Sequence, residues 1–583
     1  MSNRNFLIVL GNASATAAQS NIMLELRNVT LSSGRATEER WLLQAISGQF
    51  PQGQFHAVVG PSGCGKSTLL KVIAGVRQPN EGTVHWAGRD LEEHDLAPHE
   101  IGYVPQFSIA FDLLRVDESI DTALRLRVGG LSKEEREART ARFLSEVGLS
   151  EIADRRVGIL SGGQKRRLAL ALELVSEPLL LLCDEVTSGL DPKSESEIVH
   201  LLHKISRLDR RTVLSVTHSL RHLDLHDSVT VLYEGRLIYQ GPPGLLSHYF
   251  QIDSPENLFP ILGTRSAHDW QELWTKHAAY YEQRAADAEK DDHIPAVQFR
   301  RPDLLTQFFT LLRRRWTLFF RDRSQIGLQL ALLFGFPCLV VIFAWGGLPQ
   351  IQNLTAIPSN ALQQLLETAA FTLRSSRVAS LVSGLVMFQV ILLTLMGSNN
   401  AAREIAGERA IFEKEKFSGL RPATYIASKV AFLSFLIAAQ SVWMGIFVSM
   451  ICRFPGDLLA QIAVLGLTNA AMTFICLAIS SLTRSAENAS LLCIYLVGFQ
   501  LPLSGAVLAL PHFIGLVTRP FIAAFWGWSG YLQTMRDTRF YDFVQSMAQT
   551  ELVAIELCAW VLLMHALAGI LVAYLGAQNS RWQ

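Results

Sequence analysis

The strongest motif in this 583-residue chain is the run Gly60-Pro61-Ser62-Gly63-Cys64-Gly65-Lys66-Ser67-Thr68. It fits the pattern GxxxxGK[ST] and stands between a β-type stretch, residues 57–59, and an apolar helical stretch, residues 69–73. The glycines let successive backbone N–H groups and a helix N-terminus turn toward phosphate groups. In that arrangement Lys66 reaches the outer phosphates of a nucleotide and Ser67 ligates Mg²⁺. The alternative is a glycine-rich turn without a ligand, but the flanking strand and helix favour a phosphate loop.

A pair of carboxylates follows the most apolar stretch of the first half. Residues 179–183, four leucines and a cysteine, predict a strand buried on both faces, and Asp184 and Glu185 come directly after it. The carboxyl end of a parallel strand is where an open α/β sheet places its ligand. We therefore expect Asp184 to join the Mg²⁺ shell and Glu185 to orient or deprotonate an attacking water. The alternative is an acidic pair that faces solvent.

Further β-type stretches predict the rest of a sheet. Residues 212–216 form one strand, and residues 229–233 and 237–239 form a hairpin around Glu234-Gly235. Helical patterns lie between these strands, which indicates an α/β fold for the first half of the chain.

Charge is distributed unevenly along the chain. The 52 Lys and Arg balance the 52 Asp and Glu, which argues against a partner such as nucleic acid, and the 49% apolar content excludes disorder. However, 79 of the first 324 residues are charged and only 25 of the last 259. Soluble domains are about one-quarter charged, so the second half is predicted to lie in a membrane.

The seven cysteines form no CxxC pair, which argues against a zinc site or a disulfide framework and indicates a reducing compartment.

Six apolar segments in the second half each approach the roughly 20 residues that span a hydrocarbon core. They are residues 326–345, 379–396, 430–452, 459–482, 489–508 and 552–575. Between the last two, residues 513–528 form a shorter apolar stretch that could dip into the membrane and return. Polar residues inside spans are candidate functional groups. These are Gln389, Gln440, Asn469, Gln500, Glu556 and His565.

Positive charge predicts the orientation of the segments. Lys and Arg gather before the first segment, including the run Arg313-Arg314-Arg315, and between the second and third, at residues 403–429. The opposite loops carry fewer, so the positive-inside rule places the first half and both termini in the cytoplasm. Residues 303–321 predict a basic amphipathic helix, which we expect at the cytoplasmic interface beside anionic headgroups. The alternative is a helix with a solvated charged face.

A second motif, Leu160-Ser161-Gly162-Gly163-Gln164, lies between the phosphate loop and the acidic pair. With it, the first half resembles the ATP-binding cassette (ABC) ATPases, whose signature is LSGGQ. The resemblance extends to Gln106, to the stretch Ser188-Gly189-Leu190-Asp191-Pro192 and to His218, in that family's order and spacing, and it covers about residues 23–263. It implies an α/β P-loop ATPase domain that takes ATP and Mg²⁺.

The resemblance also implies roles for individual residues. The catalytic group would be Glu185, His218, Lys66 and Gln106, with the metal held by Ser67, Gln106 and Asp184. The signature residues Ser161, Gly162, Gly163 and Gln164 would contact the γ-phosphate bound to the opposite subunit, and Asp191 would bridge the dimer. The family often has an aromatic residue that stacks on adenine ahead of the phosphate loop. Residues 31–34 offer none there, and Trp41 is the nearest candidate.

The second half resembles the ABC-2 type permeases, in particular the G-subfamily (White-type) half-transporters and their bacterial relatives. The likeness is carried by the charged segment 402–415 and by residues 419–425, which look like the cytoplasmic helix that couples to the ATPase. Gln164 and Val186 depart from the VSGGERKR and DEPTSGLDS patterns of that subfamily. The expected domains are an N-terminal extension, a nucleotide-binding domain, a linker, an amphipathic connecting helix and an all-α membrane domain of six transmembrane helices. Their ranges are 1–22, 23–263, 264–301, 302–324 and 325–583.

One phosphate loop, one signature and six spans imply a half-transporter in a bacterial inner membrane. It would pair with a second subunit, identical or different, and use ATP to move a substrate that the sequence does not identify, with export favoured by the resemblance. Two alternatives remain open. The ATPase could drive a mechanical or regulatory task, such as lipid extraction or gating, without solute translocation, or it could gate a channel.

Overall fold

The computed structural model describes residues 22–33, 40–93, 96–107, 109–208, 210–285, 300–348, 368–506, 510–538, 541, 544–545 and 550–580. The chain forms two compact units, one from the residues up to Asp303 and the other from Leu304–Lys416 and Leu420–Ser580. Residues 1–21 of the expected N-terminal extension and residues 286–299 of the expected linker lie outside the described residues.

A six-stranded sheet forms the centre of the first unit, in the order β10-β9-β3-β8-β7-β6. Neighbouring strands from β9 to β6 are parallel, and β10 pairs with β9 in the antiparallel sense. Every residue of β3, β7 and β8 is buried, as expected for strands covered on both faces. The predicted strands and hairpin are therefore confirmed. The bounds are β3 Phe55–Val59, β6 Ile101–Val104, β7 Leu180–Asp184, β8 Thr212–Val216, β9 Ser228–Tyr233 and β10 Arg236–Gly241.

A four-stranded antiparallel sheet, in the order β2-β1-β4-β5, is additional to the expected elements. Along β1 the side chains alternate, because Leu24 and Leu26 are buried whereas Glu25 and Arg27 between them are not. The buried face shares one hydrophobic core with the central sheet. The bounds are β1 Ile22–Ser33, β2 Arg40–Pro51, β4 Glu81–Trp86 and β5 Arg89–Asp90.

Helices flank both sheets of the first unit. Their bounds are α2 Lys66–Ile73, α3 Val116–Arg127, α4 Lys133–Glu146, α5 Gly162–Leu174, α6 Pro192–Leu208, α7 Leu246–Phe250, α8 Leu258–Leu262 and α9 Ala267–Ala285. Helix α9 covers a stretch for which we expected a linker from residue 264. It packs on β10 because Trp270 and Trp274, one helical turn apart, are buried in the core, with the rings of Trp274 and Tyr239 5.4 Å apart. The compact unit thus extends beyond the expected boundary at residue 263.

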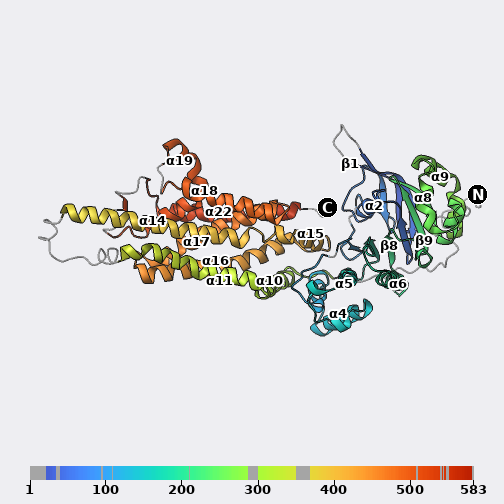
Figure 1. Ribbon diagram of the computed structural model, residues 1–583, viewed down its shortest axis with the longest axis horizontal. Coiled ribbons are helices and arrows are strands. Elements are labelled where there is room, and N and C mark those ends of the chain that lie inside the picture. The colour runs from blue at the N-terminus through green and yellow to red at the C-terminus, as the bar shows by residue number, and fades with distance from the viewer. Residues whose placement is uncertain are drawn as a thin grey trace, which may run out of the picture. The chain divides into compact units, whose positions relative to one another are not determined.

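The second unit is helical. Within the described residues, six helices are long and apolar enough to cross a membrane, in agreement with the six predicted segments. These are α11 Arg323–Ala344, α14 Thr368–Ala401, α16 Pro422–Cys452, α17 Leu458–Leu482, α18 Ala486–Leu503 and α22 Ile555–Asn579. Helices α14, α16, α17 and α22 run lengthwise beside one another (Figure 1). Shorter helices complete the unit: α10 Leu304–Arg321, α15 Arg409–Phe417, α19 His512–Thr518 and α20 Ala523–Gln533.

The apolar stretch 513–528 forms parts of two helices, α19 and α20. Residues 523–532 of α20 are all buried, and the helix packs on α14, α17 and α22. A hydrogen bond from the Trp528 indole to the Ser383 hydroxyl, 3.2 Å long, joins α20 to α14. The α20 part of the stretch therefore belongs to the packed interior of the second unit, whereas Phe513 and Leu516 of α19 are exposed.

Helix α10 forms at the expected position, but its basic run behaves differently from our expectation. Arg314 and Arg315 are buried, and each makes a bidentate ion pair, with Glu415 and Glu404 respectively. The expectation that the run faces lipid headgroups was wrong for these two residues. Because a buried guanidinium needs a carboxylate partner, the pairs bind α10 to the segment between α14 and α16.

Candidate active site

The phosphate loop connects the end of β3 at Val59 to the start of α2 at Lys66. It is tightly enclosed at two glycines. A Cβ at Gly60 would lie 2.2 Å from the carbonyl oxygen of Leu232, and a Cβ at Gly65, where φ is +105°, would lie 2.7 Å from that of Leu42. Only glycine avoids these clashes and adopts the positive φ. At the open side of the loop, Ser62 and Gly63 are exposed.

Lys66 is buried inside this loop. Its side chain donates to the carbonyl oxygens of Gly60 and Pro61, both at 2.9 Å, and lies 4.0 Å from the Cys64 sulfur. These are neutral partners, and a buried ammonium is stabilised far more by an opposite charge. The loop therefore fits a polyphosphate, whose oxygens would supply that charge.

Asp184 and Ser67 form a small oxygen cluster beside the loop. The Ser67 hydroxyl donates to Asp184 Oδ1 at 2.7 Å, and the buried Tyr103 hydroxyl donates to Oδ2 at 3.0 Å. Burial raises the pKa of Asp184, which a divalent cation would counteract. Hydroxyl and carboxylate oxygens suit Mg²⁺, which usually takes few protein ligands together with substrate phosphates. Among the described residues, no cluster of three or more His, Cys, Asp or Glu could hold a metal by itself.

Glu185 is held between two side chains of the predicted catalytic group. Its Oε2 accepts from Gln106 Nε2 and its Oε1 contacts His218 Nε2, both at 2.8 Å. The backbone at Glu185 has φ of +49°, a left-handed conformation that is strained for a residue other than glycine. Its N–H donates to the carbonyl oxygen of Val216 at 3.2 Å, which fixes this turn against the end of β8. The carboxylate therefore has a defined position between Gln106 and His218.

These groups meet because they follow neighbouring parallel strands. The phosphate loop follows β3, Gln106 follows β6, Asp184 ends β7 and His218 follows β8. In the sheet these strands are ordered β3-β8-β7-β6, so their carboxyl ends form one edge, as expected for the ligand site of an α/β sheet. Tyr103, the third residue of β6, also belongs to this site. It was not predicted, although its place in the strand that leads to Gln106 is a usable signal.

The signature residues make local contacts. Ser161 caps the N-terminus of α5, with its hydroxyl accepting from the Gln164 N–H at 3.3 Å and its own N–H donating to Gln164 Oε1 at 3.0 Å. Asp191 in turn caps α6 through Ser194, whose hydroxyl donates to it at 2.6 Å. Gly163 lies next to Ser194, so the structure brings these two motifs together. Ser161, Gly162 and Asp191 are exposed.

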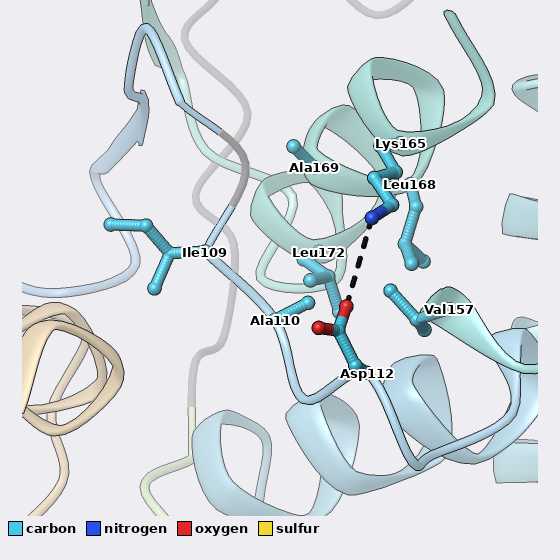
Figure 2. Close-up of a pocket in the computed structure, with 8 residues that line it drawn as sticks. All are labelled: Ile109, Ala110, Asp112, Val157, Lys165, Leu168, Ala169 and Leu172. Carbon is cyan, nitrogen blue, oxygen red and sulfur yellow. Dashed lines mark ion pairs between the residues drawn. The ribbon is translucent and has the colours of Figure 1, made fainter. Parts of the chain in front are cut away.

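A small cavity lies between the segment that follows Gln106 and the signature helix α5 (Figure 2). Its volume is about 30 Å³, enough for about one water molecule and too small for a nucleotide or a substrate. Asp112 and Lys165 face each other across it, with 3.7 Å between Asp112 Oδ1 and Lys165 Nζ. The pair joins the segment after Gln106 to the helix that carries the signature.

Trp41 and Cys64, two further residues from the sequence analysis, differ in their exposure to solvent. Trp41 is 46% exposed on β2, and the next residue, Leu42, carries the carbonyl that approaches Gly65. Trp41 therefore remains the candidate for stacking on a base beside the loop. Cys64 is only 4% exposed, and burial raises the pKa of its thiol. Both features disfavour reaction of Cys64 with bulky thiol reagents, because the thiolate is the reactive form.

Two family models match the chain. Residues 43–188 match the model described as ABC transporter, and residues 306–526 match the one described as ABC-2 type transporter. Among curated proteins, the chain is 28% identical over 546 residues to the ABC transporter ATP-binding/permease protein Rv1747 of Mycobacterium tuberculosis. That alignment covers 88% of this chain but 57% of the relative, so the chain spans little more than half of that protein's length.

Other relatives match the first unit alone. The energy-coupling factor transporter ATP-binding protein EcfA1 of Mycoplasma mobile is 36% identical over 224 residues, which cover 38% of this chain and 80% of that protein. A solved structure, the dimeric post-hydrolysis state of the ATP-binding cassette MJ0796 bound to ADP and Pi, is 30% identical, with a TM-score of 0.35, and the match covers 38% of this chain and 99% of that one. The chain belongs to the ABC transporter family and joins an ABC transporter domain to an ABC-2 type transporter domain in one polypeptide.

Proposed function

We propose that this chain is one half of an ATP-driven exporter and that two such halves form the working transporter. The observation that carries the proposal is the division of the site within one chain. Lys66 donates to carbonyl oxygens of its own loop, and Glu185 contacts His218 at the same edge of the sheet. Ser161 and Asp191 are exposed, and the hydrogen bonds of their side chains within the described part of the chain are local. In a symmetric dimer, the signature of each copy would meet the phosphate loop of the other, so that two ATP molecules are enclosed at the interface.

The residues at the edge of the sheet divide the chemistry of hydrolysis among them. Lys66 would leave the carbonyl oxygens of Gly60 and Pro61 and bind the β- and γ-phosphate oxygens. Ser67, Asp184 and Gln106 would hold Mg²⁺, which neutralises phosphate charge when bound. His218 would turn from Glu185 to the γ-phosphate, and the released carboxylate oxygen would then orient the attacking water and accept its proton.

Closure of the dimer would be transmitted to the membrane unit through the segment that follows α14, which includes α15. Binding of ATP would then switch a membrane cavity from inward- to outward-facing, and hydrolysis would reset it. Export as the direction rests on the resemblance of the second half to the ABC-2 type permeases. The bacterial relative and the distribution of Lys and Arg support a plasma-membrane location with the ATPase unit in the cytoplasm.

The proposal is tested with full-length protein reconstituted into vesicles. We expect ATPase activity that is lost in Lys66→Ala and reduced by about 10²–10⁴ in Glu185→Gln, because Glu185 would act as the general base. Lys204→Ala is the matched control, since this lysine is exposed on α6, and it should retain the wild-type rate. Wild-type rates in both site variants would refute the assignment of the site. ATP-dependent accumulation of solute in inverted vesicles would support export, whereas ATPase activity without any accumulation across a broad solute panel would favour the mechanical or regulatory alternative.

A further inference from the structure

Two basic side chains of the segment after α14 bind the carboxyl ends of two long helices. Arg409, the first residue of α15, donates through Nη2 to the carbonyl oxygen of Ser481 in the last turn of α17. Lys416, near the end of α15, donates to carbonyl oxygens at the end of α22, those of Ala577 at 3.0 Å, Ser580 at 2.9 Å and Gln578. We refer to residues 402–416 as the cytoplasmic segment, following the proposed orientation.

The cytoplasmic segment has a third attachment to α17. The buried hydroxyl of Ser480 accepts hydrogen bonds from the backbone N–H groups of Ile405 at 3.1 Å and Ala406 at 3.0 Å. These are the residues at the start of the short helical turn Ala406–Glu408 that leads into α15. The end of α17 is therefore bound both by backbone donors and by the Arg409 guanidinium.

Helices α17 and α22 are in close contact with each other. A Cβ at Gly569 of α22 would lie 2.5 Å from the carbonyl carbon of Phe474, and a Cβ at Gly576 would lie 2.4 Å from the Ser481 hydroxyl. Residue numbers rise together along both helices between these two contacts, so α17 and α22 run parallel in a fixed register. Backbone-to-side-chain contact at small residues is the arrangement that lets membrane helices approach most closely.

The parallel arrangement explains why Arg409 and Lys416 of the cytoplasmic segment lie at the carboxyl ends of α17 and α22. Parallel helices bring two negative dipole ends together, each with carbonyl groups that no intrahelical N–H satisfies. Lysine and arginine at helix carboxyl ends satisfy such carbonyls and offset the dipole. Arg409 and Lys416 each do this for one helix of the pair, and both lie on the nine-residue helix α15.

We propose that Arg409 and Lys416 are positioning residues that join α15, α17 and α22 into one rigid body, so that any displacement of the cytoplasmic segment moves both spans together. This inference rests on the proposed function, in which ATP binding displaces that segment. The inference adds that α22 moves together with α17. It also adds that the positive charges of Arg409 and Lys416 on α15 connect the two helices.

The test uses full-length protein in nanodiscs, with the exposed Cys338 replaced by Ala and with Glu185→Gln to retain ATP. A spin label at Leu557→Cys, at the start of α22 where the side chain is half exposed, reports the distance between the two copies in the dimer. We expect ATP to shift this distance in the otherwise unmodified protein and to leave it unchanged in Arg409→Met/Lys416→Met. The charge-retaining pair Arg409→Lys/Lys416→Arg should restore the shift, which a loss of folding would not explain.

A second measurement needs no change in the cytoplasmic segment. Labels at Leu459→Cys and Leu557→Cys within one chain, diluted with unlabelled copies, report the distance between the starts of α17 and α22. We expect this distance to be the same with and without ATP. A change in it, or an undiminished shift in the methionine variant, would overturn the inference while leaving the proposed function intact. If ATP produced no shift at Leu557 even without the segment variants, the inference would likewise be overturned, whereas wild-type ATPase rates in both Lys66→Ala and Glu185→Gln would overturn the proposed function.

Discussion

Two buried glutamines in the membrane unit should respond in opposite directions to the same substitution. Gln389 of α14 is fully buried, and neither its amide nitrogen nor its amide oxygen has a hydrogen-bond partner among the described residues. Gln440 of α16 is equally buried, but its oxygen accepts from Asn400 at 2.9 Å and from Asn469 at 3.1 Å, and its nitrogen donates to Gln329 at 3.1 Å. The two side chains thus carry the same amide group, which is hydrogen-bonded at Gln440 and has no partner among the described residues at Gln389.

The expected magnitudes follow from these contacts. An unsatisfied buried polar atom costs about 1–3 kcal/mol, so Gln389→Leu, which removes two of them at similar volume, should stabilise the unit by about 2–6 kcal/mol. Gln440→Leu removes four interhelical hydrogen bonds, the three above and one from the Gln440 nitrogen to Asn400 Oδ1 at 3.2 Å. Each contributes about 0.6 kcal/mol within a membrane, so the substitution should destabilise by about 2 kcal/mol. The assay is thermal unfolding of the full-length protein followed by tryptophan fluorescence. The reasoning would be refuted if Gln389→Leu lowered the transition temperature as Gln440→Leu does, because the Gln389 amide would then have a binding partner such as water or substrate.

Three further predictions concern the first unit. Gly60→Ala should abolish binding of a fluorescent ATP analogue, because the added methyl group would lie 2.2 Å from the Leu232 carbonyl oxygen, and retained binding would contradict the described loop. Burial lowers the pKa of His56 and of His226 to about 4, so between pH 6.5 and 4 the unfolded state binds more protons. Stability should therefore fall as the pH falls, by about 1.4 kcal/mol per pH unit for each histidine, and His226→Phe should reduce that slope in thermal unfolding at pH 7.5 and 5.0. A maleimide should label Cys64 far more slowly in native protein than in denaturant, and equal rates would show that the thiol is accessible.

Local patterns in the sequence predicted the elements that form the site. Residues 179–183 are a continuous apolar run that predicts the buried strand β7, and the phosphate loop has glycines at fixed positions, so both are visible without tertiary information. The order of the parallel strands was not predicted, because parallel strands in any order bring residues such as Gln106, Asp184 and His218 to one edge of the sheet. The likeness to a known family supplied the roles of the signature residues, which their local hydrogen bonds do not reveal.

Contacts between distant parts of the chain could not be predicted in the same way. Arg315 lies 89 residues from Glu404, and their buried ion pair places in a packed interior a side chain that was expected at a lipid surface. A basic helix face has the same sequence pattern whether it meets headgroups or carboxylates, so only the fold distinguishes the two. Tyr103 was missed for a similar reason, because its hydroxyl gains significance only when β6 and β7 are paired.

Complementation between two inactive variants tests most directly whether each ATP site is shared by two chains. Lys66→Ala inactivates the phosphate loop and Ser161→Phe obstructs the signature, so each variant alone should show almost no ATPase activity. A mixed dimer isolated through two different affinity tags retains one intact site, composed of one chain's phosphate loop and the other's signature, and should hydrolyse ATP at about half the wild-type rate. Activity of the mixed dimer at the background level, or near-normal activity of Ser161→Phe alone, would contradict the account.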